Sequence, residues 1–370
     1  MIKVECISDY EEFKRLRESW EELREKQPAE DMIFLAHGWF DCWWRSYSDG
    51  AKLFILLARK NNRLVGIAPF MVRQAFVRGL PTRLVSFIDN GNSGHNDFII
   101  DAAVRQEVLK AFFLYLRKDF KSWDVLELKR IPPESGNFCL IPELLRHDHF
   151  FYIEKMGTNA PYLRTDDKAW TIFYDRLSSK KKKNLRNIRN RISREGNYEV
   201  KSLTSFSDYE RVRPDLREIV RNSWSAYIES SLNRPQNAKF MNLLSQWAGE
   251  RGWLQIWLLS LQDKPIAFEY HLKYHDRVHG LRSSFNKNFA HLSPGVLLDY
   301  HIVKAYFKRD DIAEYDMGGN ADFYKRQWTK EAREHKTFQI FSLNPYSKVI
   351  YFYEWLWENI LWRLKKICFP

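Results

Sequence analysis

Apolar and polar residues follow the same pattern at two places along the chain. Residues 52–72 form an apolar run, a polar pair and a second apolar run, and residues 253–274 repeat this arrangement. Val65-Gly66 falls where Ile266-Ala267 falls in the second copy. Apolar runs of this length around a short polar turn are typical of β-hairpins. The pattern therefore predicts two hairpins of the same design.

The segments around the two hairpins also correspond. A helical, Trp-bearing segment precedes each hairpin, and each hairpin is followed by a strand, a loop, a helix and a further strand. We predict a duplicated mixed α/β protein whose second unit begins near residue 160. The predicted parts are a first unit (1–160), a second unit (161–345) with a basic helix (176–195), and an aromatic tail (346–370).

The composition is that of a folded protein with sizeable cores, since 45% of the 370 residues are apolar. The four cysteines lie far apart, which argues against a disulfide scaffold or a zinc site and suits a reducing compartment. The N-terminal segment carries acids early and is not expected to be a signal peptide. No run of 18 uncharged apolar residues occurs, so no ordinary transmembrane helix is expected.

The net charge of +12 is concentrated in one segment. Between Arg176 and Arg194 there are nine basic residues and no acid. Such a segment attracts an anionic partner: nucleic acid, an acidic lipid surface, a nucleotide-linked sugar or an acidic carrier protein. The alternative is a solvated helix without a partner. The nine residues are Arg176, Lys180, Lys181, Lys182, Lys183, Arg186, Arg189, Arg191 and Arg194.

Residues 293–307 begin with Ser-Pro-Gly and continue as a predicted helix. Ser293 before Pro294 is a common helix start, because a serine side chain caps free N–H groups and proline at the first position loses no needed donor. The same helix start would also hold a phosphate or a thioester carbonyl through its free N–H groups and its dipole. The sequence leaves both interpretations open.

The order of hairpin, strand, loop, helix, strand and helix resembles the core of GNAT acyltransferases. More specifically, the chain resembles the tandem-GNAT proteins described as BioF2-like or CelD-like acetyltransferases, which are relatives of the FemAB peptidyltransferases. The shared motifs are Ser293-Pro294-Gly295, Tyr315-Asp316-x-Gly318 and Tyr324-Lys325-x-x-Trp328, together with the basic helix. The resemblance implies two tandem GNAT-like α/β units with mixed sheets flanked by helices.

The resemblance also implies a donor site in the second unit. Acetyl-CoA or a longer acyl-CoA would bind at the helix that begins with Ser293, Gly295 and Val296, and Lys287 could add positive charge; no metal is expected. This loop has one glycine where the usual acetyl-CoA loop has several, and Pro294 has no N–H group. A donor without a pyrophosphate, such as an aminoacyl-tRNA, therefore remains an alternative.

Acyl transfer to an amine requires a base and an acid. Tyr324 matches the position of the tyrosine acid of many GNAT enzymes, although it could also be a packed aromatic residue. Glu269 is an acid within an apolar strand, where burial would raise its pKa; the alternative is a salt bridge to Arg282. Asp316 could orient a substrate hydroxyl or cap the turn at Gly318.

Further residues are expected to contact the acceptor. His95 and Asp97 share a turn in the first unit that could line the acceptor cleft or be a hydrogen-bonded loop. The remaining substrate-binding candidates are Arg282, Lys325, Lys182 and Arg186.

The last segment, residues 349–370, combines aromatic residues with Glu354 and Glu358 and with cations near its end. It would lie in a membrane interface or pack onto the body or a second subunit. We expect a cytoplasmic protein, peripheral on the inner membrane face in the first case.

The expected function is N-acyl transfer from a thioester donor to an amine on a cell-envelope or polysaccharide precursor. The alternatives are a FemAB-type aminoacyl-tRNA-dependent transferase, whose basic helix would meet RNA, and a non-catalytic GNAT-like protein that binds a glycan precursor or a membrane.

Overall fold

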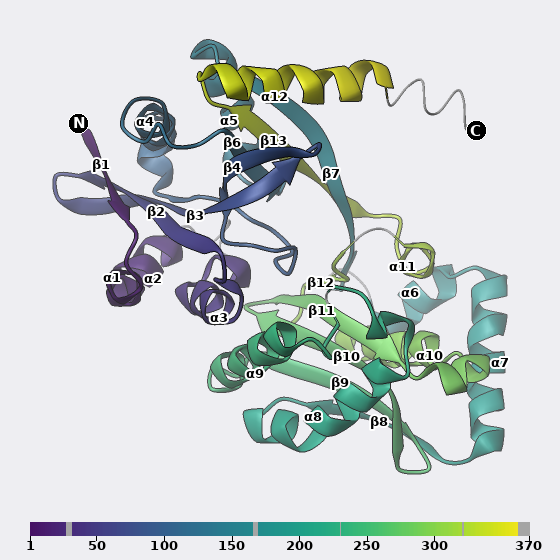
Figure 1. Ribbon diagram of the computed structural model, residues 1–370. Helices are drawn as coiled ribbons and strands as arrows, with labels where there is room; N and C mark the ends of the chain where they lie inside the picture. The colour runs from purple at the N-terminus through teal and green to yellow at the C-terminus, as the bar shows by residue number, and fades with distance from the viewer. Residues whose placement is uncertain (27–31, 166–168, 230, 320–321, 362–370) are drawn as a thin grey trace. The chain divides into compact units, whose positions relative to one another are not determined.

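The chain folds into two compact units, shown in the ribbon of the computed structural model (Figure 1). The first unit consists of residues 1–158 and 334–370, and the second of residues 159–333. Each unit contains a mixed sheet flanked by helices, so the predicted α/β class is confirmed. The structure describes all residues except 27–31, 166–168, 230, 320–321 and 362–370.

The sheet of the first unit has the strand order β1-β2-β3-β4-β6-β13-β7, in which β4 and β6 are parallel. The strands are β1 (Ile2–Ile7), β2 (Ala51–Lys60), β3 (Arg63–Val77), β4 (Leu80–Phe87), β5 (Ile99–Ile100), β6 (Val125–Ile131), β7 (Phe151–Arg164) and β13 (Ala332–Phe341). The α-helices are α1 (Tyr10–Arg15), α2 (Arg17–Glu25), α3 (His37–Tyr47), α4 (Arg105–Lys118), α5 (Asn137–His147) and α12 (Pro345–Leu356).

The sheet of the second unit has the order β7-β12-β11-β10-β9-β8, in which β11 and β12 are parallel. Its own strands are β8 (Tyr198–Leu203), β9 (Leu254–Leu261), β10 (Lys264–Tyr274), β11 (Arg277–Phe285) and β12 (Glu314–Asp316). Its α-helices are α6 (Trp170–Arg176), α7 (Ser179–Glu195), α8 (Phe206–Arg221), α9 (Pro235–Gly249), α10 (Pro294–Tyr306) and α11 (Phe323–Arg326).

The two predicted hairpins are present and have the same construction. Each has a two-residue turn, Asn61-Asn62 or Gln262-Asp263, in which both residues have positive φ, as in the turns that suit twisted hairpins. Val65 and Ile266 are each skipped in the pairing register, so each hairpin bulges at the same place. The predicted equivalence of the two segments is therefore confirmed.

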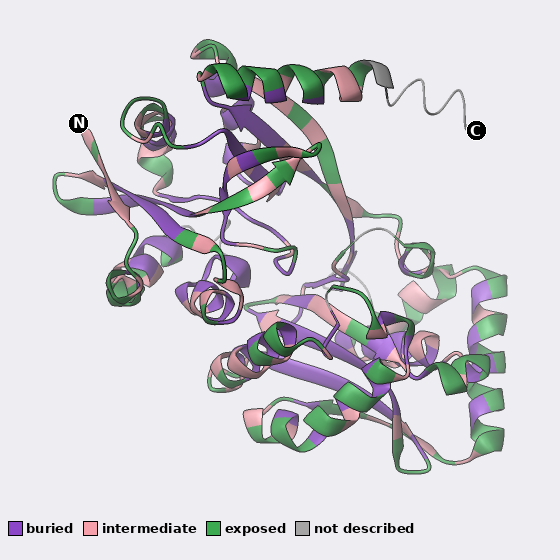
Figure 2. Cartoon of the chain, in the orientation of Figure 1, coloured by how far each residue is buried: buried purple, intermediate pink, exposed green. Residues whose placement is uncertain are grey.

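Buried strands lie between helices in both units, and Figure 2 shows them as purple ribbons. In the first unit, Gly66 faces α4 closely: a Cβ atom there would lie 2.4 Å from Val108 Cγ1. In the second unit, α10 covers one face of the sheet, while the Tyr270 hydroxyl reaches Ser245 of α9 on the other face, at 3.0 Å. Alternate residues of β10 therefore point to different helices.

The structure differs from the predicted boundaries at the C-terminal end. The sequence predicts that residues 334–345 belong to the second unit and residues 346–370 to a separate tail, but the described part of this segment belongs to the first unit. β13 pairs with β6 between Lys336 and Phe341. Ile350 of α12 is buried with Leu84, Val125 and Phe341. Hydrophobic packing therefore places the predicted tail on the body, at least as far as α12 extends.

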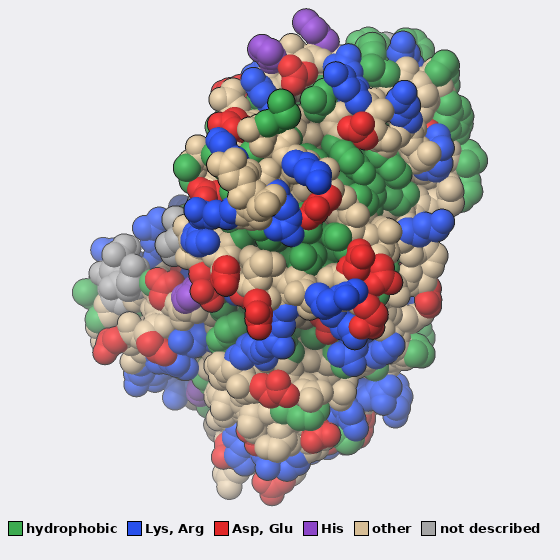
Figure 3. Space-filling view, turned by 90° about the vertical axis from the view of Figure 1, so that its left-hand side faces the viewer, with side chains coloured by type: hydrophobic (Ala, Val, Ile, Leu, Met, Phe, Trp, Pro, Cys, Tyr) green, Lys and Arg blue, Asp and Glu red, His purple; other side chains and the backbone are tan. Residues whose placement is uncertain are grey.

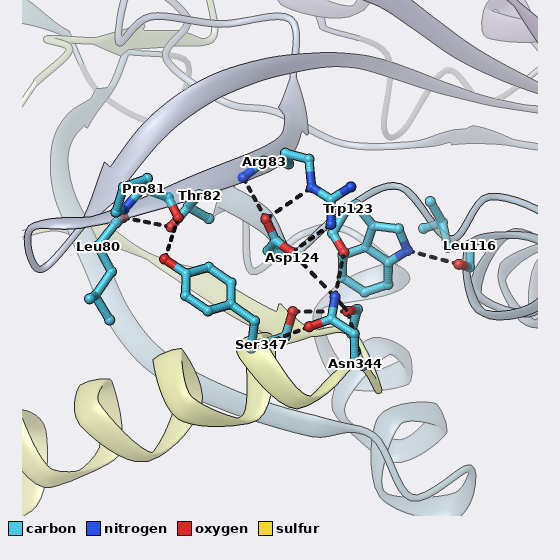
Figure 4. Close-up of polar contacts among 11 residues, drawn as sticks. Leu80, Pro81, Thr82, Arg83, Leu116, Trp123, Asp124, Asn344 and Ser347 are labelled. Carbon is cyan, nitrogen blue, oxygen red and sulfur yellow. Dashed lines mark hydrogen bonds and ion pairs between the residues drawn. The ribbon is translucent and has the colours of Figure 1, made fainter.

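A polar cluster fixes the start of α12 (Figure 4). Asp124 accepts hydrogen bonds from the backbone and guanidinium of Arg83 and from the Asn344 side chain. Asn344 in turn caps α12 by accepting from the backbone N–H of Ser347 at 2.7 Å. These bonds tie the helix start to Arg83 of β4 and to Asp124, the residue before β6.

The two sides of α12 have opposite characters. Glu354 is buried, and its carboxylate pairs with Arg78 at 2.8 Å and Lys155 at 2.5 Å. Val349, Phe352 and Trp355 are exposed on the other side. Among the described residues, no helix is long and apolar enough to cross a membrane.

Candidate active site

The parallel strands β11 and β12 separate after a short paired stretch. Arg277–His279 pair with Glu314–Asp316, and beyond this point a cavity of about 120 Å³ opens between Gly280–Ser283 and Met317–Gly319. Backbone groups of the two strands that do not pair with each other thus border an open space. This geometry suits an extended ligand that lies between the strands.

The turn after β12 requires glycine. Gly318 has φ +64°, and a Cβ atom there would lie 2.2 Å from the carbonyl oxygen of Gly280. Asp316 Oδ1 accepts from the Gly318 N–H at 2.8 Å, so Asp316 caps this turn. The Lys325 ammonium donates to the Gly318 carbonyl at 2.6 Å. Asp316 and Lys325 therefore shape one wall of the small cavity.

A larger cavity of about 570 Å³ lies between β10, β11, α10 and α11. Gly295 and Val296, predicted to bind the donor, line it together with Phe285 and Leu298. Trp224 also lines the cavity, although 64% of this residue is exposed, which places an aromatic ring at the opening. The walls are mainly apolar, so the cavity suits a ligand that carries an apolar chain.

Two buried carboxyl groups meet where the two cavities adjoin. Glu269 of β10 and Asp299 of α10 line both cavities and hydrogen bond to each other. Burial raises the pKa of Glu269. Burial, and next the charge of Glu269, raise the pKa of Asp299 well above its usual value. We infer that Asp299 holds a proton at neutral pH while Glu269 is the group that ionises first.

Glu269 is supported from the interior by His271, two residues along the strand. His271 Nε2 lies 2.8 Å from Glu269 Oε2, and His271 Nδ1 lies 2.6 Å from the hydroxyl of Tyr306. Burial lowers the pKa of His271 to about 3, so the ring is neutral and this contact is a hydrogen bond. With the proton on Nε2, the ring donates to Glu269 and accepts from Tyr306.

Two tyrosines complete the site. The Tyr315 hydroxyl donates to Glu269 Oε2 at 3.2 Å, which gives the carboxylate a second donor. Tyr324 lines both cavities beside Glu269 and Asp299. Burial first, and then the two carboxyl groups, raise the pKa of Tyr324, so its phenol keeps its proton at neutral pH.

A buried cation lies on the other side of Asp299. Lys181 of α7 donates to Gln327 Oε1 at 3.0 Å, and its ammonium lies 4.2 Å from the centre of the Trp328 ring. Burial lowers the pKa of Lys181, whereas the charge of Asp299 raises it. The start of the basic helix is thus part of the wall behind the carboxyl pair.

Ser293 does not act as the predicted helix cap. It has φ +54° and ψ +50°, in the left-handed region, and its side chain makes no capping hydrogen bond. Its hydroxyl instead lies 3.3 Å from Nη2 of Arg191, which donates to it. Lys287 begins a short 3₁₀ helix (Lys287–Leu292), where it is exposed and does not line the larger cavity.

The register of β10 and β11 decides between the two interpretations of Glu269. Ser283 lies opposite Glu269, whereas Arg282 lies opposite Tyr270 and so points to the other face of the sheet. The proposed salt bridge from Arg282 to Glu269 is therefore wrong. Arg282 borders the smaller cavity, and its Nη1 donates to the Leu281 carbonyl at 2.9 Å.

The remaining predicted residues lie in the first unit and on α7. His95 and Asp97 are buried in the first unit: His95 Nδ1 lies 2.6 Å from His335 Nε2, and Asp97 accepts from Asn137 at 2.7 Å. This turn has the contacts of a hydrogen-bonded loop. Lys182 and Arg186 lie on α7 at a third cavity.

The first unit has no counterpart of the carboxyl site at the corresponding positions. Counting from the two hairpin turns, Ala68 occupies the position of Glu269, and Phe70 that of His271. Phe70 packs against Phe87 and Phe98, with ring centroids 5.3 and 5.6 Å away. The described polar network therefore belongs to the second unit alone.

Sequence reasoning missed Asp299 and the supporting role of His271. Asp299 interrupts the apolar run Leu297-Leu298 to Ile302-Val303 on a helix whose length and composition indicate burial. An acid in that position is costly unless it is paired, and this signal was available in the sequence.

Residues 179–326 match a family model described as an acetyltransferase (GNAT) domain. This segment carries both cavities, the carboxyl pair and the basic helix. The search among curated proteins gives no match.

Solved structures show the same fold across nearly the whole chain. FemX has a TM-score of 0.60 at 11% identity, covering 94% of this chain and 100% of that one. The C-terminal domain of a lysylphosphatidylglycerol synthetase from Agrobacterium fabrum has a TM-score of 0.55 at 10% identity, covering 90% and 94%. A tandem GNAT protein from the clavulanic acid biosynthesis pathway has a TM-score of 0.52 at 8% identity, covering 92% of this chain and 98% of that one. The predicted resemblance to tandem-GNAT, FemAB-like proteins is thus confirmed at the level of the fold.

The depressed pKa of His271 should make folding pH-dependent. An unfolded chain protonates this histidine below about pH 6.5, whereas the folded site resists protonation until about pH 3, so stability falls as the pH falls between these values. Urea unfolding at pH 7 and pH 5 should show a loss about 2 kcal/mol smaller in His271→Gln than in the parent protein. The exposed His291→Gln should keep the parent's pH dependence. Equal losses in all three proteins would contradict this assignment.

Proposed function

Because the second unit contains a GNAT acyltransferase domain, we propose that this protein transfers an acyl group from a thioester donor to an amine, with Glu269 as the base. The observation that supports this most directly is the buried Glu269–Asp299 pair at the junction of the two cavities. It supplies a proton acceptor with a raised pKa where two substrates can meet. Coenzyme A thioesters are the donors that the GNAT fold generally uses.

The local residues fit such a donor in part. The separated strands β11 and β12 would hold an extended pantetheine arm through backbone groups of Gly280–Ser283. The start of α10 offers the N–H groups of Gly295 and Val296, while Pro294 offers none. The Arg191 guanidinium next to Ser293 adds positive charge there.

In the proposed reaction, the amine nitrogen of the acceptor attacks the carbonyl carbon of the thioester, and the carbon–sulfur bond breaks. Glu269 accepts the proton that the nitrogen loses, and the Tyr324 hydroxyl donates a proton to the departing sulfur. Asp299 keeps its own proton and donates a hydrogen bond to Glu269. His271 and Tyr315 orient the carboxylate through Oε2.

We further propose that the donor or the acceptor carries an apolar chain, because the larger cavity has mainly apolar walls. An acceptor on a cell-envelope or polysaccharide precursor is consistent with this. The synthetase neighbour is named for a lipid product, and the present chain shares its fold. A second candidate is an aminoacyl-tRNA donor. It is favoured by the sparse glycine content of the loop before α10 and by the positive charge of α7.

A membrane surface is the proposed location for this activity. Phe352 and Trp355 stack at 6.3 Å on the exposed side of α12, and Val349 extends their stripe by one helical turn. Exposed aromatic and aliphatic side chains on a fixed helix suit the headgroup region of a lipid bilayer. The cations predicted to assist, Arg363, Lys365 and Lys366, lie outside the described residues.

Replacing the base should stop turnover without unfolding the site. Glu269→Gln is expected to lower kcat by about 10²–10⁴-fold and to remove the rise of rate with pH that reflects ionisation of Glu269. Tyr324→Phe should lower kcat with little change in donor affinity. Steady-state kinetics between pH 5 and 9 tests both, with the exposed Glu199→Gln as the control. If Glu269→Gln kept the parent's rise of rate with pH, Glu269 would be excluded as the base.

The donor class is tested with acetyl-, octanoyl- and palmitoyl-CoA and with aminoacyl-tRNA. Burial of additional methylene groups should make kcat/KM at least about tenfold higher for a longer acyl donor than for acetyl-CoA. Val296→Trp should abolish this preference, because the indole would fill part of the cavity. Transfer from aminoacyl-tRNA alone would instead support the second candidate.

The membrane proposal is tested by co-sedimentation with vesicles of phosphatidylglycerol and phosphatidylcholine. Phe352→Ser with Trp355→Ser should weaken partitioning by about tenfold, because two interfacial aromatic rings are lost. Tyr227→Ser removes an aromatic side chain from a residue that is 90% exposed in the second unit, and it should change nothing. Unchanged binding of the α12 variant would exclude α12 as the contact.

A further inference from the structure

A third cavity, of about 290 Å³, lies on the outer side of α10 and is bordered by basic side chains. α7 contributes Lys182, Arg186 and Arg189 at successive turns of one face, together with Leu185. Tyr174 of α6 and Tyr300 of α10 form the remaining wall. Tyr300 directly follows Asp299, which lines the other two cavities, so α10 separates this cavity from the carboxyl pair.

Within the described residues, carboxylates balance the positive charge in this cavity only at Lys182. Lys182 lies 3.7 Å from Asp175 Oδ1, but within the described part of the chain no carboxylate oxygen lies within 4.0 Å of Arg186 or Arg189. On the face of the molecule in Figure 3, Lys and Arg side chains lie among Asp and Glu side chains. α7, by contrast, has no acid before Glu195. Its cations therefore repel one another unless an anion is present.

The cationic side chains are held over aromatic rings. The Arg189 guanidinium lies 5.8 Å from the centre of the Tyr300 ring, and the Lys182 ammonium lies 5.7 Å from that of Tyr174. These contacts orient the charged groups before a ligand binds. The side chains therefore lose less conformational entropy on binding. The same positive charges also affect the pKa of the neighbouring His301. Burial first, and then Arg189 and Lys304, lower its pKa to about 4.

We propose that this cavity binds a phosphate ester, whose phosphate group is held by Arg186 and Arg189. A planar guanidinium group can donate two parallel hydrogen bonds to two oxygens of one phosphate, which makes arginine well suited to this ligand. The volume exceeds the space that one phosphate ion needs, so the ligand has room for a nucleoside or sugar beside the tyrosines. A solvated helix face explains exposed cations, but it does not explain why three of them border one cavity. The site does not depend on the proposed acyl transfer.

Isothermal titration calorimetry with the full-length protein tests the site. The probes are inorganic pyrophosphate, adenosine 5′-monophosphate and a short RNA duplex. The test variant is Arg186→Gln with Arg189→Gln. The matched control is Lys180→Gln with Arg194→Gln, which removes the same charge from the opposite side of α7. Circular dichroism checks that both variants fold.

We expect the test variant to bind at least one probe about tenfold more weakly than the parent protein, and the control less than about threefold more weakly. Loss for the nucleotide identifies a small phosphate ester, loss for pyrophosphate identifies its phosphate group as the part that is bound, and loss for RNA alone identifies a phosphodiester backbone; each result supports the site. Equal losses in the two variants would show only diffuse attraction to α7 and would overturn the proposal. So would the absence of binding of every probe to the parent protein.

Discussion

The second unit depends on one constraint: two carboxyl groups lie together in a place from which water is largely removed. Two buried negative charges at this distance would be strongly unfavourable. The carboxyl groups of Glu269 on β10 and Asp299 on α10 therefore keep one proton between them. The neutral His271, the hydroxyl of Tyr315 and the nearby Lys181 each reduce the cost of the remaining charge. α7, α10 and β10 are therefore coupled through the state of a single proton.

The two hairpins have the same backbone construction, but one is packed with polar side chains and the other with apolar ones. Both hairpins share turn type, bulge and register, yet the position of Glu269 is held by Ala68 in the first unit. Phenylalanine rings fill the corresponding space there, and hydrophobic packing needs no balancing partners. The polar network of the second unit is therefore not needed for the hairpin to fold. Its presence is explained by the proposed reaction.

Local features of this structure could be predicted from the sequence, and non-local ones could not. Two apolar runs around a polar pair predict each hairpin, and Ser293-Pro294-Gly295 predicts the start of α10, because these signals lie within a few residues of each other. Glu269 stood out as an acid in an apolar strand. The left-handed Ser293 and the pairing of β13 with β6 carry no comparable signal. Each depends on contacts with distant parts of the chain, such as Arg191 for Ser293.

The discontinuity of the first unit has a consequence for how the protein is made. Its sheet requires β13, and its core requires Ile350 of α12, both of which leave the ribosome after the entire second unit. Until then, β6 has an unpaired edge rich in valine, leucine and isoleucine, the kind of edge that invites pairing with other chains. The second unit, whose residues form one continuous stretch, can complete its fold first, so synthesis of this protein passes through a stage in which the second unit is folded while the first is still incomplete.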